Sequence, residues 1–378
     1  MELMKNGLSK SAVKRISKAL SQVLNNDNVK YKKYKVFNID AFENACLHQL
    51  ESLELKERVN HIINVLHQFL PNDFILKAEI LTSITQVWDF GEVNDPLKNF
   101  AAWPIIDYFS VYGLTQPEVS LNALKKLTHL FSAEFAIRPF IIKYPELCHE
   151  LFLEWIHDKS SHIRRLVSEG TRPKLPWGIQ LKKFVADPTP NLVLLDHLKS
   201  DTSLYVRRSV ANHLNDIAKN HPDIVINTCK KWSQLKNKDV DWVIKHATRT
   251  LVKNGNVDVF PLLGFTEKPE ILIEEFKTSE SKIKLGNTIK FAFCIKSLKH
   301  EIQTLVIDYA VYFNKANNKQ QAKVFKLKNI ILQPHQSINL TKSFSFKAIT
   351  TRKYYCGEHK IELLVNGKPL LNKSFTVI

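Results

Sequence analysis

The chain has 378 residues, and its 54 Lys and Arg exceed its 37 Asp and Glu, so its formal net charge is +17. A hydrophobic content of 44% and a charged content of 24% are typical of a folded globular protein and exclude wholesale disorder. Glycine is scarce, and neither a G-x-G-x-x-G motif nor a P-loop motif occurs, which argues against those nucleotide-binding folds. The charge indicates a polyanionic partner, nucleic acid before an anionic membrane surface, with a basic protein that lacks such a partner as the alternative.

The five cysteines are far apart and form no C-x-x-C pair, so we expect neither a zinc ribbon nor a disulfide scaffold. The N-terminal residues lead into a basic amphipathic stretch and lack the apolar core of a secretory signal. No run of 18 or more apolar residues occurs, so no membrane span is expected. We therefore expect a cytoplasmic protein without a membrane partner.

Residues 1–265 are predicted to be helical. Stretches such as 59–70 and 121–131 repeat apolar residues at i, i+3, i+4 and i+7, the pattern of a helix with one buried face. Prolines such as Pro71 and Pro117 lie between these stretches, where helices are expected to end. Near residue 265 the hydrophobic period changes, which predicts a domain boundary there.

From residue 150 onward the helices also repeat. Residues 162–169 (HIRRLVSE) align with 205–212 (YVRRSVAN), and a weaker third copy covers 242–249 (WVIKHATR). The offsets of 43 and 37 residues are typical of HEAT-like helical pairs. Asp158 and Asp201 precede the first two copies at the same distance, which is also HEAT-like. We predict an all-α HEAT-like repeat solenoid with a concave surface, because single helical pairs cannot bury their apolar faces alone.

Equivalent positions of such repeats project toward the same concave space. One predicted row contains Arg165, Arg208 and Lys245, and the next, one helical turn along, contains Glu169, Asn212 and Arg249. A row of cations at repeat spacing suits a phosphate backbone. The alternative is that an arginine pairs with the Asp of the neighbouring repeat, although the doublets 164–165 and 207–208 cannot point both members the same way.

An acidic residue interrupts the second row. A carboxylate at Glu169 weakens attraction for DNA, so it needs another purpose. A Pro-bounded loop follows it and places Trp177 near the end of the helix. A second carboxylate, Glu134, lies about one repeat upstream, with Arg138 four residues later. On the residues alone, two solvated helix carboxylates remain the alternative to a catalytic pair.

Residues 266–378 are predicted to be a small β domain. Short β-branched and aromatic runs at 288–296, 305–313, 324–327, 337–346 and 359–365 are separated by turn clusters. Six or seven such strands in this length indicate an immunoglobulin-like sandwich, with another small all-β fold as the alternative. This part carries 19 basic and 9 acidic residues, a net charge of +10.

Three segments resemble a known family. Residues 135–140 (FAIRPF), 164–178 (RRLVSEGTRPKLPWG) and 205–219 (YVRRSVANHLNDIAK) are similar to AlkC, a family of bacterial DNA glycosylases for alkylated bases that belongs with AlkD to the HEAT-like-repeat superfamily. The middle motif is the most specific, and the resemblance extends over about residues 10–378. It implies DNA repair by hydrolysis of the N-glycosidic bond of cationic lesions, chiefly 3-methyladenine and 3-methylcytosine. It also implies a bent duplex whose lesion is not flipped into a tight pocket.

The resemblance also implies residue roles. Glu134 and Glu169 would be the active-site carboxylates, Trp177 would stack near the lesion and deoxyribose, and Arg165 would orient Glu169. We predict further DNA contacts by the polar residues on or beside the repeat helices: Arg138, Arg164, Arg165, Arg172, Lys174, Arg207, Arg208, Asn212, Lys245 and Arg249.

This chemistry is reasonable on its own terms. A base methylated at N3 is cationic and leaves as a neutral molecule, so it needs no general acid. The charge moves to the sugar, where a carboxylate stabilises the oxocarbenium ion and positions water. An indole adds a cation–π attraction of about 0.5–2 kcal/mol. We expect no metal or organic cofactor, and no lyase activity from Lys174.

The β domain is expected to grip the DNA backbone. The candidate contacts are Lys282, Lys284, Lys326, Lys328, Arg352 and Lys353, with a solvated lysine-rich surface as the alternative. For the whole protein, a non-catalytic HEAT scaffold that binds nucleic acid or protein is the competing hypothesis. Two acids beside an indole favour the enzyme, and we expect a monomer.

Overall fold

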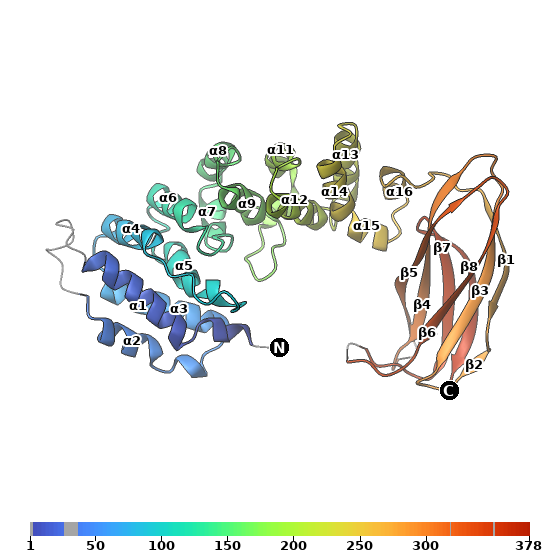
Figure 1. Cartoon of the computed structure of the whole chain (residues 1–378), viewed down its shortest axis with the longest axis horizontal. Coiled ribbons are helices and arrows are strands. Elements are labelled where there is room, and N and C mark those ends of the chain that lie inside the picture. The colour runs from blue at the N-terminus through green and yellow to red at the C-terminus, as the bar shows by residue number, and fades with distance from the viewer. Residues whose placement is uncertain (1–2, 26–36, 318, 351) are drawn as a thin grey trace. The chain divides into compact units, whose positions relative to one another are not determined.

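The structure is a computed structural model that describes residues 3–25, 37–317, 319–350 and 352–378. Helices form the first part of the chain and strands the second, which confirms the predicted fold class (Figure 1). The helices are α1 (Lys10–Leu24), α2 (Ile39–Leu47), α3 (Leu55–Phe69), α4 (Phe74–Ser83), α5 (Trp103–Tyr112), α6 (Pro117–Leu127), α7 (Arg138–Lys143), α8 (Pro145–Trp155), α9 (Ser161–Gly170), α10 (Lys182–Ala186), α11 (Thr189–Leu198), α12 (Leu204–Ile217), α13 (Pro222–Ser233), α14 (Lys238–Ala247), α15 (Arg249–Lys253) and α16 (Val259–Leu262). The strands are β1 (Ile271–Thr278), β2 (Lys282–Ile283), β3 (Thr288–Ser297), β4 (Gln303–Asn314), β5 (Gln320–Leu332), β6 (Ser337–Ser345), β7 (Gly357–Val365) and β8 (Lys368–Val377). None of the helices within these described residues is long and apolar enough to cross a membrane.

Two compact units make up the chain, residues 1–217 and 218–378. The last helix ends at Leu262 and the first strand begins at Ile271, so the change from helix to strand includes the expected boundary at 265. The compact units divide earlier, so α13 to α16 group with the strands. In the first unit, α4, α6, α8 and α11 follow one another on one side, while α5, α9 and α12 lie on the other (Figure 1).

The first two sequence repeats form equivalent structures. Both begin at the second residue of their helix, in α9 and α12. The carboxylate of Asp158 accepts a hydrogen bond from the backbone N–H two residues later at 2.9 Å, and Asp201 does the same at 2.8 Å. Such bonds satisfy backbone donors ahead of a helix, which explains the spacing of the two aspartates. The third copy starts four residues into α14, so its register differs.

The first arginine of each doublet supports the repeat. Arg164 donates to both carboxylate oxygens of Asp201 at 2.6 and 2.9 Å, and so ties α9 to the start of the next repeat. Arg207 donates to the carbonyls of Asp201 and Thr202. The alternative of pairing between repeats therefore holds for Arg164. The Nη1 of Arg164 also donates to the carbonyls of Asp158 and Lys159, so this side chain has a structural role, and its expected DNA contact stays a prediction.

A close approach explains the glycine at the end of α9. A Cβ on Gly170 would lie 2.7 Å from the Cγ2 of Ile137, which is completely buried. Only glycine therefore lets the end of α9 pack against the turn that precedes α7. This contact brings the segment with Glu134 next to the helix with Glu169.

The second unit contains the β-sandwich. One sheet has the strand order β1-β3-β6 and the other β2-β8-β7-β4-β5. Alternate residues of β3 are buried, as expected for a strand with one face on a core. Across the two sheets, the rings of Phe291 and Tyr309 pack 5.1 Å apart. Strand β5 is much longer than the expected 324–327, because it is an edge strand whose exposed lysines break the hydrophobic pattern.

The last helices contact the sandwich through glycine backbones. A Cβ on Gly255 would lie 2.9 Å from the carbonyl oxygen of Gly367 in the β7–β8 turn. Both glycines have positive φ, +71° and +76°, a conformation that disfavours other residues. The α15 end and the β7–β8 turn therefore require glycine on both sides of their contact.

Candidate active site

One arginine contacts both predicted carboxylates. Arg165, on α9, donates from Nη1 to the Oε2 of Glu134 at 2.7 Å, and its Nη2 lies 3.7 Å from the Oε1 of Glu169. It also donates to the hydroxyl of Ser132 at 2.8 Å. The structure thus brings the two acids together around one guanidinium. The closer carboxylate is that of Glu134, so Arg165 fixes Glu134 more directly than Glu169.

The charges of this cluster support one another. Burial lowers the pKa of Arg165, but the charges of Glu134 and Glu169 outweigh it and raise that pKa above its ordinary value. The ring of Tyr205, from α12, lies 4.6 Å from the centre of the Arg165 guanidinium. This stacked position leaves Arg165 little rotational freedom, so the carboxylates meet a preorganised cation.

The Glu169 carboxylate is held by donors on both oxygens. Its Oε1 accepts from Arg172 at 2.6 Å, and its Oε2 accepts from the hydroxyl of Ser209 at 2.5 Å. Only 5% of Glu169 is exposed, whereas the Glu134 side chain is 14% exposed. The two predicted acids therefore differ in kind, because Glu169 is a fixed buried anion and Glu134 is open to solvent on one side.

A third carboxylate, absent from the sequence predictions, completes the cluster. Asp216, on α12, accepts from the Nε of Arg172 at 2.8 Å and is 2% exposed. Burial lowers the pKa of Arg172, while Glu169 and Asp216 raise it, and the net direction is upward. Asp216 lies one turn after Asn212 on the same helix face. That spacing could have indicated Asp216 from the sequence, but the aligned repeat copy ended at Asn212 and did not include it.

A buried histidine lies beneath the cluster. The Nδ1 of His213 is 2.9 Å from the carbonyl oxygen of Ser168, and the residue is completely buried. Burial lowers the pKa of His213 to about 4, so the imidazole is neutral at pH 7. As a neutral group it does not oppose the charge of Arg172.

Trp177 is displayed on a constrained loop. Its φ is 64°, a left-handed value that is uncommon for a bulky residue, and 52% of the residue is exposed. The neighbouring Leu175 is buried and anchors the loop. The indole is therefore exposed, as expected, while its place next to the carboxylates and its role toward a base stay predictions.

Arg138 holds this loop from inside. It is completely buried, and it donates to the carbonyls of Gly170 at 2.8 Å and Ile179 at 2.5 Å. Burial, followed by repulsion from Arg172, lowers the pKa of Arg138 to about 10, so it remains charged at pH 7. The expected DNA contact by Arg138 is corrected to a structural role, because its side chain is completely buried. Arg172 is 8% exposed and binds two carboxylates, and its expected DNA contact stays a prediction.

The remaining predicted DNA contacts stay open to a partner to different extents. Arg208, Lys245 and Arg249 are exposed, and Lys174, Arg207 and Asn212 are half-buried. Arg208 belongs to the first compact unit and Lys245 to the second, so the continuity of the predicted row stays a prediction. Within the described parts of the chain, no cluster of His, Cys, Asp and Glu is arranged to hold a metal ion.

Fold and site together define a helical-repeat protein with a buried arginine–carboxylate cluster, an exposed indole on the loop that follows α9, and an immunoglobulin-like domain formed by its strands. A family model described as the C-terminal Ig-like domain of the uncharacterised protein YhaZ matches residues 272–378. YhaZ of Bacillus subtilis (strain 168) is 35% identical over 336 residues, which cover 89% of this chain and 91% of YhaZ. A solved structure of the Pseudomonas fluorescens alkylpurine DNA glycosylase AlkC, bound to DNA containing an abasic site analog, matches with a TM-score of 0.84 and 33% identity over the whole of both chains. The chain belongs to the AlkC family, which also includes YhaZ, and the resemblance found in the sequence is confirmed.

Proposed function

We propose that the protein is a DNA glycosylase that removes alkylated bases from duplex DNA by hydrolysis of the N-glycosidic bond. The observation that carries the proposal is the cluster in which Arg165 contacts Glu134 and Glu169 beside the exposed Trp177. The AlkC neighbour was solved with DNA that contains an abasic site analog, which corresponds to the product of base removal. We propose N3-methylated bases as substrates, chiefly 3-methyladenine and 3-methylcytosine.

The two carboxylates would have different roles in the reaction. An N3-methylated base is cationic, and bond cleavage transfers positive charge to the deoxyribose. Glu169 has a donor on each oxygen, so it suits a fixed negative charge that stabilises the oxocarbenium ion. Glu134 is bonded to Arg165 through Oε2 and is more exposed, so it suits the positioning of the attacking water. Trp177 would cover the cationic base with its indole face.

The cost of the buried charges favours a catalytic role. Burying ions costs several kcal/mol per ion unless pairing is nearly ideal. The side chains of Arg172, Glu169 and Asp216 are 9%, 6% and 2% exposed, and a well-packed apolar cluster would stabilise the fold at least as well. A non-catalytic scaffold has no use for this arrangement next to a half-exposed tryptophan. We therefore favour the enzyme.

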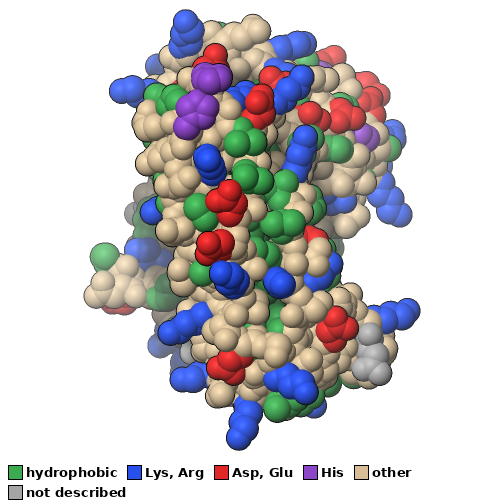
Figure 2. Space-filling view, turned by 90° about the vertical axis from the view of Figure 1, so that its right-hand side faces the viewer, with side chains coloured by type: hydrophobic (Ala, Val, Ile, Leu, Met, Phe, Trp, Pro, Cys, Tyr) green, Lys and Arg blue, Asp and Glu red, His purple; other side chains and the backbone are tan. Residues whose placement is uncertain are grey.

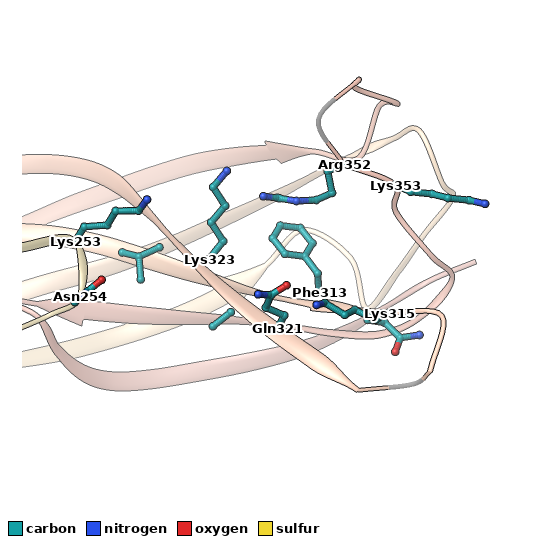
Figure 3. A pocket seen from close by; sticks show the side chains of 11 residues that line it. Lys253, Asn254, Phe313, Lys315, Gln321, Lys323, Arg352 and Lys353 are labelled. Atoms are coloured by element: carbon teal, nitrogen blue, oxygen red, sulfur yellow. The ribbon is translucent and has the colours of Figure 1, made fainter. Parts of the chain in front are cut away.

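The β domain offers a basic pocket for the DNA backbone. The pocket has a volume of about 560 Å³, and the guanidinium carbon of Arg352 lies 4.3 Å from the centroid of the Phe313 ring. Figure 3 shows Arg352 and Phe313 together in this pocket. Among the described residues that line the pocket none is acidic, and the cations are Lys253, Lys315, Lys323, Arg352 and Lys353. Stacking on Phe313 preorganises Arg352 for a phosphate. We propose that this pocket is where the β domain grips DNA.

Not all the predicted β-domain contacts can belong to that surface. Lys282 lies on β2 and Lys326 on β5, the two opposite edges of the five-stranded sheet. Figure 2 shows basic side chains interspersed with acidic and hydrophobic ones on one side of the sandwich, without a patch of one sign. We therefore retain Arg352 and Lys353 as backbone contacts in preference to Lys282 and Lys284.

The experiment is release of free base from duplex DNA treated with a methylating agent. Wild-type protein should release 3-methyladenine, and Glu169→Gln should lose orders of magnitude in rate while it still binds DNA. Arg208→Met removes an exposed charge on α12 outside the cluster. It is the matched control, because it should weaken DNA binding without removing a carboxylate of the site. Tight DNA binding without release by the wild type would support the scaffold and refute the enzyme.

A further inference from the structure

The Trp177 loop needs outside support. A left-handed backbone is unfavourable for a bulky residue such as Trp177, and such a conformation persists only when its surroundings enforce it. Gly178 permits the close packing, since a Cβ there would lie 3.1 Å from the Leu175 side chain and 3.3 Å from Arg138. Within the loop, the Gly178 N–H donates to the carbonyl of Leu175 at 3.2 Å. These local contacts fix the turn but leave the carbonyl of Trp177 itself to be satisfied from elsewhere.

Two cations from distant parts of the chain bind this loop. The buried Arg138 binds the carbonyl of Ile179, as described above. On the other side, the Nζ of Lys56 donates to the carbonyl of Trp177 at 2.8 Å. Lys56 lies on α3, 121 residues away in sequence, and its side chain is exposed. The loop is therefore held at two carbonyls, once from the core and once from the surface.

The surroundings of Lys56 connect it to the rest of the site. Its charge acts on Asp107, whose carboxylate accepts from the indole N–H of Trp103 at 2.7 Å. The Trp103 ring in turn stacks on Phe135 at 5.4 Å, and Phe135 directly follows Glu134. Lys56 thus binds the loop with Trp177, and its charge also acts on the carboxylate that holds the Trp103 indole.

We propose that Lys56 is a positioning residue that holds the strained Trp177 backbone so that the indole faces the bound base. The inference rests on the proposed glycosylase function, since it assigns Lys56 to the same site. Lys56 acts through the Trp177 carbonyl and does not touch the substrate. Its effect must therefore depend on the Trp177 side chain being present.

A double-mutant cycle tests this dependence. Single-turnover rates of 3-methyladenine release are measured at saturating enzyme for wild type, Lys56→Met, Trp177→Ala and the double variant. A hydrogen bond from a charged donor is worth enough to change the rate about tenfold, so Lys56→Met should be about tenfold slower with unchanged DNA affinity. In the Trp177→Ala background the same change should have no effect. Lys56→Arg should restore most of the rate, and Lys126→Met, which removes an exposed lysine of α6, should behave as wild type.

Three results would overturn the proposal. Equal rates for Lys56→Met and wild type would remove the positioning role. An undiminished effect in the Trp177→Ala background would show that Lys56 acts independently of the indole. A loss of DNA affinity at unchanged rate would make Lys56 a DNA contact.

A measurement without activity separates this proposal from the glycosylase proposal. In protein labelled with 5-fluorotryptophan, the Trp177 resonance is identified by its loss in Trp177→Phe. Lys56→Met should shift or broaden that resonance and leave in place those of the tryptophans other than Trp103, whose indole N–H donates to the Asp107 carboxylate on which the Lys56 charge acts. If wild type releases no base but Lys56→Met changes the Trp177 resonance, the glycosylase proposal is wrong, and the proposal that Lys56 positions the Trp177 loop is supported. If Lys56→Met leaves the Trp177 resonance unchanged, the proposal that Lys56 positions this loop is wrong.

Discussion

Substitutions of Arg172 and Arg208 are predicted to have opposite effects, because Arg172 is part of the buried cluster and Arg208 is exposed outside it. Replacing Arg172 by Met removes a guanidinium that binds Glu169 through Nη1 and Asp216 through Nε. Both carboxylates are buried, so the variant leaves two charges without their main partner. Breaking a buried ion pair costs about 3–5 kcal/mol. Arg165 remains 3.7 Å from Glu169 and partly compensates its charge. We therefore expect the free energy of unfolding to fall by about 3–5 kcal/mol, although two hydrogen-bonded ion pairs are broken.

The assay is thermal unfolding followed by circular dichroism. At about 2–4 °C per kcal/mol for a unit of this size, Arg172→Met should lower Tm by roughly 6–20 °C. Adding Asp216→Asn should recover part of the loss, since one stranded charge is removed. Arg208→Met should leave Tm unchanged, because that side chain is exposed, and should instead weaken DNA binding and reduce its salt dependence by about one charge. A Tm for Arg172→Met within 2 °C of wild type would refute the reasoning.

Three further predictions concern the histidine, the glycine and the β domain. The pKa of His213 is about 4 in the folded chain and higher in the unfolded chain. The free energy of unfolding should therefore be highest above pH 6.5 and fall by roughly 3 kcal/mol as the pH drops to 4, because the unfolded chain binds the proton more readily. His213→Gln should flatten the dependence of Tm on pH over that window, and an unchanged slope would contradict this. Gly170→Ala should cost about 1–3 kcal/mol in chemical denaturation, because its Cβ would overlap Ile137, and a neutral result would show that the turn yields. Arg352→Ala should lower DNA affinity and its salt slope more than Lys282→Ala at the far sheet edge, and equal losses would argue against the pocket.

The sequence predicted the two acids and the indole because motif and repeat spacing carry that information. Glu134, Glu169 and Trp177 fall in the segments that resemble AlkC, and the structure brings the acids onto one arginine. The burial of Arg138 could not be inferred, since a basic residue at the start of a helix is ordinarily solvated. Its position depends on two carbonyls that become neighbours only after folding. The contact from Lys56 is similarly invisible, since 121 residues separate the partners.

The arginine doublets show how one local pattern supplies both fold and function. Consecutive residues of a helix point about 100° apart, so a doublet addresses two different surroundings. In α9 the first member, Arg164, binds Asp201 of the next repeat, while the second, Arg165, binds the carboxylates of the site. In α12 the first member again binds backbone of its own repeat, but the second, Arg208, is exposed. The first position therefore maintains the repeat in both cases, while the second contacts the carboxylates of the site in α9 and is exposed in α12. Removing the charge of one member at a time should accordingly separate the two roles, because Arg164→Met should lower stability and Arg165→Met should lower the rate of base release.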